Sequence, residues 1–331
     1  MNTNHHVPVA STRRQFVGRL ALAGAVLPLT GLVSPAAQKS PPVAEAANPG
    51  PTCLHVFAKA MQWLSYADTA AMIADAGYGG IDYTVRPGGH VLPERVEEDL
   101  PRAVDAAHRA GLKVELITTG INQLDKHAET TVRTAAKLGI RYYRFGNFDY
   151  DLRLGVWESL QRLKPVLKDI AALNQAHSIH GAFQNHSGLR IGAGVWDLHE
   201  LLRDHDPRWM GCEYDICHAS VEAGLSWSVP LRLLAPWIRC SNLKDFKWTQ
   251  VGNKPAPDFV PLGDGVVEFD RYFKLVRELR IGGPISVHLE YPPFERARPL
   301  PSAAEKLRQF PPAMRKDLAV LRQLMAKHQM S

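Results

Sequence analysis

The sequence predicts a single-domain (β/α)8 barrel, and three observations support this fold class. From about residue 53 the chain alternates eight short β-rich runs with amphipathic stretches, a pattern typical of parallel strands joined by helical crossovers. Several of the amphipathic stretches end at a glycine, which is the residue that most often closes a helix. The glycine-rich phosphate turn of an open doubly wound sheet, G-x-G-x-x-G, does not follow the first run. Eight units over roughly 240 residues therefore fit a closed barrel best.

The eight expected strands are short and rich in β-branched and aromatic residues. In chain order they cover Leu54–Phe57, Gly80–Val85, Leu112–Ile117, Ile140–Phe145, His180–Gln184, Met210–Asp215, Ile238–Leu243 and Pro284–Glu290.

The clearest expected helices precede glycines that mark a helix-to-strand joint. They are Ala67–Ala76 before Gly77, Val96–Ala110 before Gly111 and Glu129–Leu138 before Gly139. The proline-rich stretch 246–264 is predicted to be a long loop on the rim where barrel enzymes carry their active sites. A last helix over Met314–Met325 is expected to pack on the outside of the barrel.

The first 46 residues are predicted to be a twin-arginine signal peptide and linker. Arg13 and Arg14 precede an uncharged apolar stretch from Leu20 to Val33, which is too short to span a bilayer and is followed by small residues suited to cleavage. The expected location is therefore periplasmic or secreted, with membrane contact only during export. The barrel is assigned to residues 47–294, and a C-terminal extension with a terminal helix to 295–331.

Charge and cysteine content exclude some function classes. The leader carries four basic residues and one acidic residue, so its removal takes three units from the formal net charge of +6. A mildly basic mature chain does not indicate a nucleic-acid partner. Of the four cysteines, three lie in expected core strands and none shows C-x-x-C spacing, so we expect buried free thiols rather than a zinc ribbon.

Polar residues gather where the predicted strands end, and in a barrel these ends form the reaction centre. Because side chains alternate along a strand, Glu213 shares a face with Asp215, Asn242 with Lys244, and His288 with Glu290. Inward charges are costly unless they are paired or ligand-bound, so Asp215, Glu290 and Lys244 are expected to meet one another, a metal or a ligand. Six further residues are candidate substrate contacts: Arg86, His90, Arg144, Asn185, His186 and Trp248. Arg86 and Arg144 could instead form buried ion pairs, and the histidines could be structural.

At these motifs the chain resembles the xylose isomerase-like TIM barrel superfamily of sugar isomerases, sugar epimerases and type IV-like endonucleases. The resemblance covers about residues 53–294 and is carried by Asn-His-Ser-Gly at 185–188, Asp215-x-x-His218, Leu-Lys-Asp at 243–245, Pro-Leu-Gly-Asp-Gly at 261–265, and Glu290. It implies a carbohydrate substrate, whereas an endonuclease would need a histidine- and acid-rich metal cluster and a basic groove.

In sugar epimerases of this superfamily a divalent metal is held by two glutamates, an aspartate and a histidine. The matching positions here are Gln184, Asp215, Asn242 and Glu290, so two of the four ligands are replaced by neutral amides. The remaining oxygen-rich set would suit Mn²⁺, Mg²⁺ or Ca²⁺. The alternative is that Lys244 neutralises Asp215 and Glu290 without a metal. Because Gln184 cannot act as a base, epimerisation by two opposed carboxylates is not expected.

The resulting hypothesis is an isomerase- or epimerase-like enzyme that transfers a proton next to the carbonyl group of a sugar or keto-sugar. Glu290 or His218 would be the general base, and Lys244 or the metal would stabilise the enolate oxygen. The same first step would serve β-elimination from a 3-keto-glycoside. A non-catalytic carbohydrate-binding barrel is the third alternative.

Overall fold

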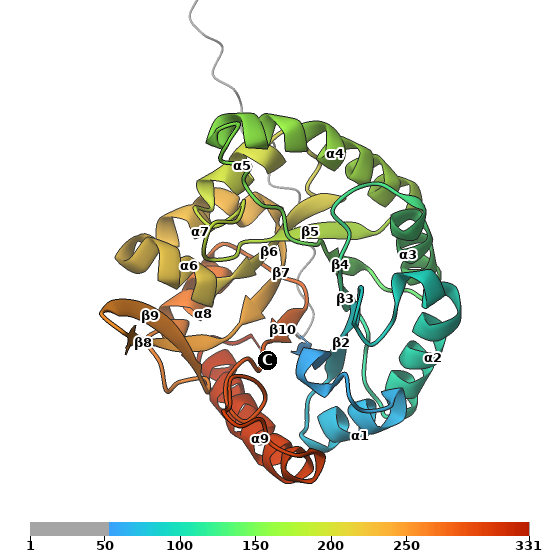
Figure 1. Cartoon of the computed structure of the whole chain (residues 1–331), viewed down its shortest axis with the longest axis vertical. Coiled ribbons are helices and arrows are strands. Elements are labelled where there is room, and N and C mark those ends of the chain that lie inside the picture. The colour runs from blue at the N-terminus through green and yellow to red at the C-terminus, as the bar shows by residue number, and fades with distance from the viewer. Residues whose placement is uncertain (1–52, 331) are drawn as a thin grey trace, which may run out of the picture. The chain divides into compact units, whose positions relative to one another are not determined.

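The computed structural model describes residues 53–330, in which eight parallel strands close into a barrel (Figure 1). The strands are β1 (Leu54–Phe57), β2 (Gly80–Val85), β3 (Leu116–Thr119), β4 (Tyr142–Arg144), β5 (His180–Gln184), β6 (Met210–Asp215), β7 (Ile238–Leu243) and β10 (Ile285–Val287). Each pairs with the next along the chain, and β10 pairs with β1 to complete the ring. The predicted fold class is thereby confirmed, with β3, β4 and β10 shorter than expected.

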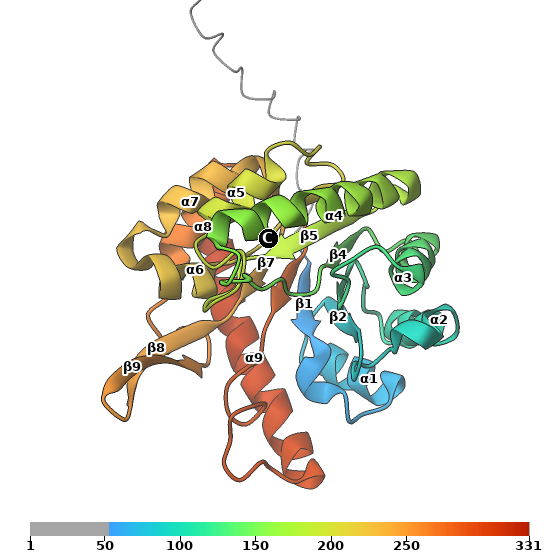
Figure 2. The ribbon, with the colours of Figure 1, turned by 45° about the horizontal axis from the view of Figure 1, so that its top comes forward.

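The helices surround the strands (Figures 1 and 2). They are α1 (Tyr66–Asp75), α2 (Val96–Arg109), α3 (Lys126–Lys137), α4 (Val156–His177), α5 (Trp196–Leu202), α6 (Ile216–Ala223), α7 (Ser228–Leu234), α8 (Phe269–Glu278) and α9 (Ala303–Lys327). Short 3-10 turns lie at Ala58–Met61, Pro93–Arg95, Gly224–Ser226 and Ala235–Trp237. Among the described helices, none is both long and apolar enough to cross a membrane.

Local sequence signals explain where several helices begin and end. Ser65 and Asp125 cap α1 and α3 by accepting backbone N–H bonds from Asp68 and Ala128. The glycines that follow α1, α2 and α3 all have positive φ, as the sequence predicts for helix closure. The four cysteines are unpaired, and three of them are buried, in agreement with the expected free thiols.

Helix α9 is longer than the helix expected at 314–325, because a capping box of Ser302 and Glu305 starts it eleven residues earlier. Pro311 and Pro312 lie inside it. Phe310, Met314 and Leu321 on one face are buried, and the helix contacts both α8 and α1. In Figure 2 it occupies the place of the eighth barrel helix, so the segment assigned to an extension contributes to the ring.

The stretch 246–264 is a β-hairpin for most of its length, rather than the irregular loop that its prolines suggest. Strands β8 (Asp245–Val251) and β9 (Lys254–Val260) pair antiparallel and only with each other (Figure 2). Pro255 and Pro257 are tolerated because a proline can occupy a position on an edge strand where no ladder hydrogen bond is required from it.

Asp245 holds the base of this hairpin. Its carboxylate, which is 1% exposed, accepts backbone N–H bonds from Phe246, Gly263, Gly265 and Val267 at 2.8–3.1 Å. This geometry explains why the Pro-Leu-Gly-Asp-Gly motif has glycine at positions 263 and 265. Gly263 has a φ of +86°, and a Cβ at Gly265 would collide with the Asp245 carboxylate.

We expect Asp245→Ala to destabilise the protein by roughly 3 kcal/mol, because it leaves several buried backbone N–H groups without an acceptor. Chemical denaturation measured by circular dichroism would give this value. Asp264→Ala is the matched control on the same loop, since Asp264 is exposed and pairs only with the exposed Lys316, and should cost less than about 1 kcal/mol. Equal stability of the two variants would contradict the role of Asp245.

Candidate active site

The ammonium of Lys244 lies between two carboxylates at the C-terminal ends of the strands. Its Nζ is 3.2 Å from Asp215 Oδ2 and 3.0 Å from Glu290 Oε2. Lys244 and Asp215 are buried, whereas the side chain of Glu290 is 16% exposed. The three residues that the sequence predicted to converge therefore do so, and one carboxylate of the group remains in reach of solvent.

Asp215 is fixed by its position between β6 and α6. Oδ1 caps α6 by accepting the His218 N–H at 2.9 Å, and Oδ2 accepts from Gln184 Nε2 at 2.9 Å as well as facing Lys244. The side chain of Asn185 bonds to both the N–H and the C=O of Asp215. Both carboxylate oxygens are thus occupied, which makes Asp215 an anchor for Lys244 rather than a proton acceptor.

The orientation of Gln184 follows from its neighbours. Arg144 can only donate, so the Gln184 oxygen accepts from the Arg144 guanidinium at 2.5 Å and the Gln184 NH₂ faces Asp215. Arg144, Gln184 and Asp215 form a chain of hydrogen bonds across β4, β5 and β6. The amide oxygen of Gln184 is therefore turned away from the carboxylates.

Burial and charge set the protonation states of the three central groups. Burial alone would raise the pKa of Asp215, but the Lys244 ammonium and the hydrogen bond from the His218 backbone N–H outweigh it and hold this pKa at about 2. Burial opposes the charge on Lys244, yet Asp215 and Glu290 together raise its pKa. In the same way Lys244 keeps the pKa of Glu290 well below its ordinary value despite burial. At neutral pH the group is one ammonium between two carboxylates.

Two histidines lie against each other beside this group. The rings of His186 and His218 are 3.9 Å apart between centroids, and Ser187 Oγ is 2.8 Å from His218 Nδ1. His218 Nε2 is 3.7 Å from Asp215 Oδ2. Burial lowers the pKa of both histidines, well below its ordinary value for His218, so both are neutral at pH 7. A neutral imidazole can accept a proton or share one with a substrate hydroxyl.

Arg86 and Arg144 both face the ring of Phe57, with each guanidinium carbon 5.7 Å from its centroid. Neither arginine forms an ion pair within residues 53–330, so the ion-pairing alternative does not apply to them. Burial and the nearby charge of Arg144 lower the pKa of Arg86. Two neighbouring guanidiniums without carboxylate partners are suited to bind oxygen-rich or anionic groups of a ligand.

Two candidate contacts lie apart from the Lys244 group. His90 bonds through its backbone N–H to Thr84 Oγ1 and packs edge-on against Tyr83, and burial lowers its pKa to about 4. Trp248 lies on β8, 51% exposed, with its ring against Phe246. No contact between either residue and Lys244, Asp215 or Glu290 is found in the described structure.

Three residues that sequence reasoning missed join the site. Lys59, just after β1, is 3.7 Å from Glu290 Oε1. Phe57 at the end of β1 stacks on His288 with centroids 4.3 Å apart. The ring centroid of Phe259 on β9 lies 5.2 Å from Lys244 Nζ, so the hairpin places an aromatic ring against the ammonium. Phe57 and Lys59 could have been predicted as site residues because they lie at the C-terminal end of a barrel strand. No local sequence signal predicts that Phe259 reaches the site.

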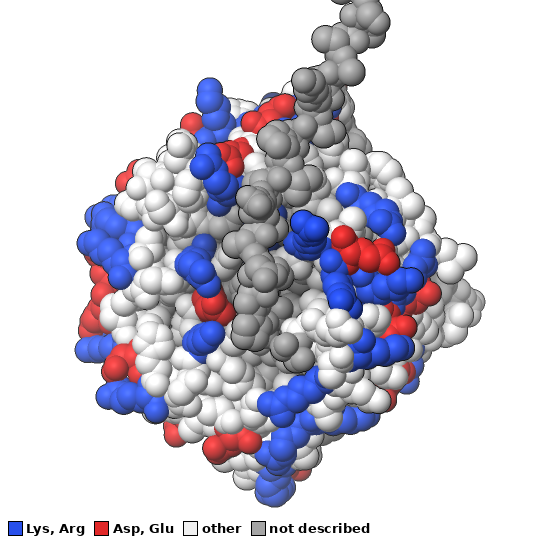
Figure 3. All heavy atoms as spheres, turned by 180° about the vertical axis from the view of Figure 1, so that it is seen from behind, with Lys and Arg blue, Asp and Glu red and all other residues white. Residues whose placement is uncertain are grey.

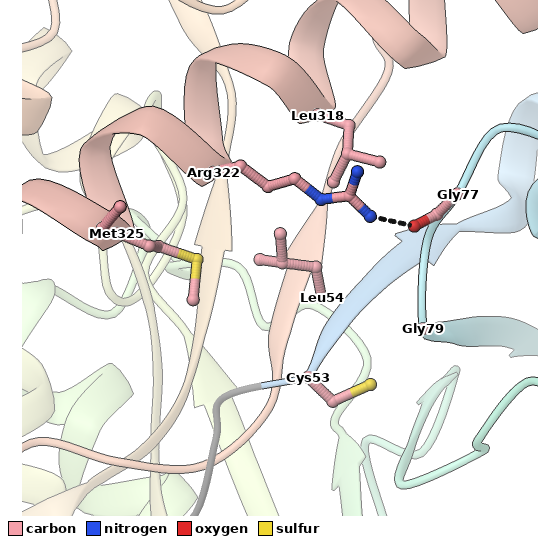
Figure 4. A pocket seen from close by; sticks show the side chains of 8 residues that line it. Cys53, Leu54, Gly77, Gly79, Leu318, Arg322 and Met325 are labelled. Atoms are coloured by element: carbon pink, nitrogen blue, oxygen red, sulfur yellow. Dashed lines mark hydrogen bonds between the residues drawn. The ribbon is translucent and has the colours of Figure 1, made fainter. Parts of the chain in front are cut away.

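Two surface pockets lie outside the Lys244 group. One, of about 520 Å³, is lined by residues such as Cys53, Gly79, Leu318 and Met325 at the N-terminal ends of β1 and β2, where Arg322 bonds to the Gly77 carbonyl oxygen (Figure 4). The other, of about 310 Å³, lies beyond β2 and β3 and includes Val85 and Pro87 on either side of Arg86. Only the second is on the same rim as the candidate site.

Comparison with known families decides the classification. A model described as "Xylose isomerase-like TIM barrel" matches residues 70–324. The chain belongs to this family. A search of curated protein sequences gives no match.

Solved structures share the fold of this xylose isomerase-like barrel at low identity. An L-ribulose 3-epimerase is 13% identical with a TM-score of 0.63, covering 84% of this chain and 96% of its own. A 3-keto-D-glucoside 4-epimerase from E. coli is 14% identical with a TM-score of 0.60, covering 82% and 99%. A probable 3-DHS dehydratase from Bacillus anthracis is 16% identical with a TM-score of 0.58, covering 82% and 99%.

The four residues at the metal position of this family's epimerases do not fit a divalent metal as they are arranged here. The Lys244 ammonium occupies the space between Asp215 and Glu290, and a second positive charge would repel it. The Gln184 oxygen is bonded to Arg144. Asn242 is buried with its amide unpartnered in the described structure, but one amide cannot replace the two lost ligands. The arrangement therefore gives no support to the metal expected at Gln184, Asp215, Asn242 and Glu290.

The Lys244 bridge predicts how stability depends on pH. The pKa of Asp215 lies at about 2 in the folded chain against an ordinary value of 3.8, so the bridge stabilises the fold above pH 4 and this contribution is lost as the pH falls toward 2. Lys244→Met removes the cation that lowers this pKa and should cost about 3–5 kcal/mol. Acid unfolding followed by fluorescence should then begin at a higher pH than in the parent.

Lys247→Met is the matched control, because Lys247 is an exposed lysine on β8 three residues away. Its acid-unfolding curve should coincide with that of the parent. An unchanged curve for Lys244→Met would show that the bridge does not hold the two carboxylates in their charged form.

Proposed function

We propose that this protein is an enzyme that transfers a proton at a carbon next to the carbonyl group of a sugar or keto-sugar. The observation that carries the proposal is the Lys244 ammonium, held between buried Asp215 and partly exposed Glu290. A fixed cation next to an accessible carboxylate is the pair that enolisation requires: a base for the carbon-bound proton and a positive charge for the developing oxyanion.

In this mechanism Glu290 accepts the proton from carbon, the electron pair of the broken C–H bond forms a carbon–carbon double bond, and the π pair of the carbonyl group moves to its oxygen. Lys244 stabilises the resulting enolate, while Asp215 keeps the ammonium in place. The lowered pKa of Glu290 makes it a weak base in the free protein, because Lys244 attracts its charge. When negative charge develops on the enolate oxygen, Lys244 interacts with that oxygen and less strongly with Glu290. The proton affinity of Glu290 therefore rises. An isomerisation is completed when the hydroxyl proton of the deprotonated carbon passes to the enolate oxygen and Glu290 returns its proton to the former carbonyl carbon.

A β-elimination from a 3-keto-glycoside is a second candidate, favoured by the state of Gln184. An epimerase that works on both faces of a carbon needs two bases, and the amide of Gln184, bonded to Arg144 and Asp215, cannot supply the second. One-sided deprotonation by Glu290 would suffice for elimination, in which the enolate expels the β-substituent and solvent protonates the departing oxygen. The similarity in fold to a 3-keto-D-glucoside 4-epimerase is compatible with such a substrate.

Arg86 and Arg144 are proposed to bind the oxygen atoms of this substrate, with His186, Asn185 and Trp248 at the edge of the same rim. We further propose that the enzyme is exported with residues 1–46 removed, which would give it access to extracellular glycosides. The leader lies outside the residues that the structure describes.

The central test is to incubate the purified protein with keto-sugars and 3-keto-glycosides in deuterated water and to follow deuterium entry at carbon by NMR. Glu290→Gln should lower the exchange rate by about a factor of 10³, because an amide cannot accept the proton. Glu295→Gln is the matched control, since Glu295 pairs with Lys59 at 3.0 Å and has no contact with Lys244, and should retain activity within a few-fold. A Glu290→Gln protein as active as the parent would remove Glu290 from the mechanism.

A second test concerns the two unpaired guanidiniums. Arg86→Gln should raise KM about tenfold or more and change kcat less, because Arg86 binds ground state and transition state alike. The effect should be largest for substrates that carry a carboxylate. Arg95→Gln provides the control, because Arg95 is exposed on the turn that precedes α2 and pairs only with Glu98 and Asp99. If both variants showed parental KM values, Arg86 would have no role in binding.

A further inference from the structure

A second group of metal-ligating side chains lies inside the barrel, two residues deeper along the strands than Asp215 and Glu290. It consists of Asp82 on β2, Glu213 on β6 and His288 directly after β10. One ligand atom of each lies within 4.8 Å of the others. All three side chains are at most 2% exposed, so they are completely enclosed by the barrel.

These side chains have few hydrogen-bond partners. Within the described residues, Asp82 Oδ1, both Glu213 carboxylate oxygens and both ring nitrogens of His288 have none. His288 Nδ1 is 3.8 Å from Glu290 Oε1, which is too long for a hydrogen bond. Buried polar groups are nearly always paired, and five unpaired atoms on three residues that meet inside the barrel require an explanation.

The nearby charge of Arg144 acts on both carboxylates and lowers their pKa, but it does not overcome the effect of burial. Neither Asp82 nor Glu213 takes part in an ion pair in the part of the chain that the structure describes. Lys244 is engaged by Asp215 and Glu290, and Arg144 donates to Gln184. Two carboxylates thus lie in the interior without a directly bonded positive group, an arrangement that costs several kcal/mol for each charge.

We propose that Asp82, Glu213 and His288 bind a divalent first-row metal ion such as Mn²⁺ or Zn²⁺. The ion would neutralise both carboxylates and provide a bonding partner for the free oxygen and nitrogen atoms. Two carboxylates with one imidazole form a mixed oxygen and nitrogen set that suits these ions better than Ca²⁺. This site shares no residue with the four rim positions and does not depend on the proposed reaction.

The surroundings of Asp82 fit a metal ligand. Its Oδ2 accepts hydrogen bonds from Thr118 Oγ1 at 3.0 Å and from Ser286 Oγ at 2.8 Å, which leaves Oδ1 directed to the group. Such hydroxyl donors orient ligating carboxylates in metal sites. Asn242 lies on β7, beside β10, and pairs in register with Ser286. Its side chain is 0% exposed, and its amide oxygen has no hydrogen-bond partner among the described residues. The ion would tie β2, β6 and the end of β10 together across the barrel.

Protons would compete with the metal ion for the carboxylates of Asp82 and Glu213. Burial raises the pKa of Asp82 to about 7 and that of Glu213 to about 8, so without a metal the pair would retain protons near neutral pH. The two states differ in a measurable way, because only the metal-bound state contains a stoichiometric ion after exhaustive dialysis.

The test is the metal content of the purified chain by mass spectrometry, measured without substrate. The parent should hold about one Mn²⁺ or Zn²⁺ per chain, and Glu213→Gln and Asp82→Asn should hold less than a tenth of that. Asp317→Asn is the matched control: Asp317 is a buried carboxylate bonded to Tyr291 and Leu262, outside the group, and its loss should leave the metal content unchanged. Gln184→Ala should likewise retain the ion, whereas its loss in that variant alone would locate the metal at the rim and overturn the proposal.

A second measurement covers variants that fail to fold. The parent is unfolded in chelator and refolded with or without added Co²⁺, Mn²⁺ or Zn²⁺. Refolding with Co²⁺ should give the visible absorption of a ligated ion and raise the Tm, and His288→Gln should weaken that absorption. A parent chain that contains no metal as purified and gains neither absorption nor Tm would overturn the proposal. Either result leaves the proton-transfer function open, because no activity enters the readout.

Discussion

The interior of this barrel depends on the position of one ammonium group. Lys244 directly follows β7, and its ammonium lies between two carboxylates. These come from the ends of β6 and β10, the two strands that flank β7 in the ring. Removing either acid would leave the lysine with one carboxylate partner in a low-dielectric interior, and removing the lysine would leave two acids there without their shared cation. The three side chains therefore fix one another's charge state, and the orientation of Gln184 and Arg144 follows from that arrangement.

The polar interior is organised in two layers that differ in how their charge is balanced. In the rim layer every carboxylate has a protein cation within about 4 Å, and Glu290 is open to solvent. In the deeper layer Asp82 and Glu213 form no ion pair within residues 53–330, and burial keeps them from water. A substrate can meet the first layer but not the second. The proposed proton transfer and the proposed metal site would thus be separated along the barrel axis by about two residues.

Much of the fold was predictable because helix-closing glycines and short β-rich runs are local signals. Gly77, Gly111 and Gly139 all adopt the positive φ that their positions indicate. Strand alternation also predicted that Asp215, Lys244 and Glu290 meet, since inward faces of neighbouring strands converge in a closed ring. The hairpin at 245–260 was not predictable, because its prolines argue against a strand unless the strand is known to lie at an edge. Phe259 and Lys59 join the site through tertiary contacts that no short segment specifies.

Within the described residues, the hairpin of β8 and β9 forms a sheet of its own, and the Asp245 carboxylate together with the Val266 N–H bond to the Phe246 carbonyl oxygen joins it to the loop that leads into α8. Its length and tip can consequently vary without disturbing the register of the eight barrel strands. Phe259 and Trp248 are carried on this appendage, so the chemical character of one side of the entrance can evolve independently of the charged centre. Substitutions in the hairpin would then change which ligands fit without changing the charged residues proposed to transfer the proton.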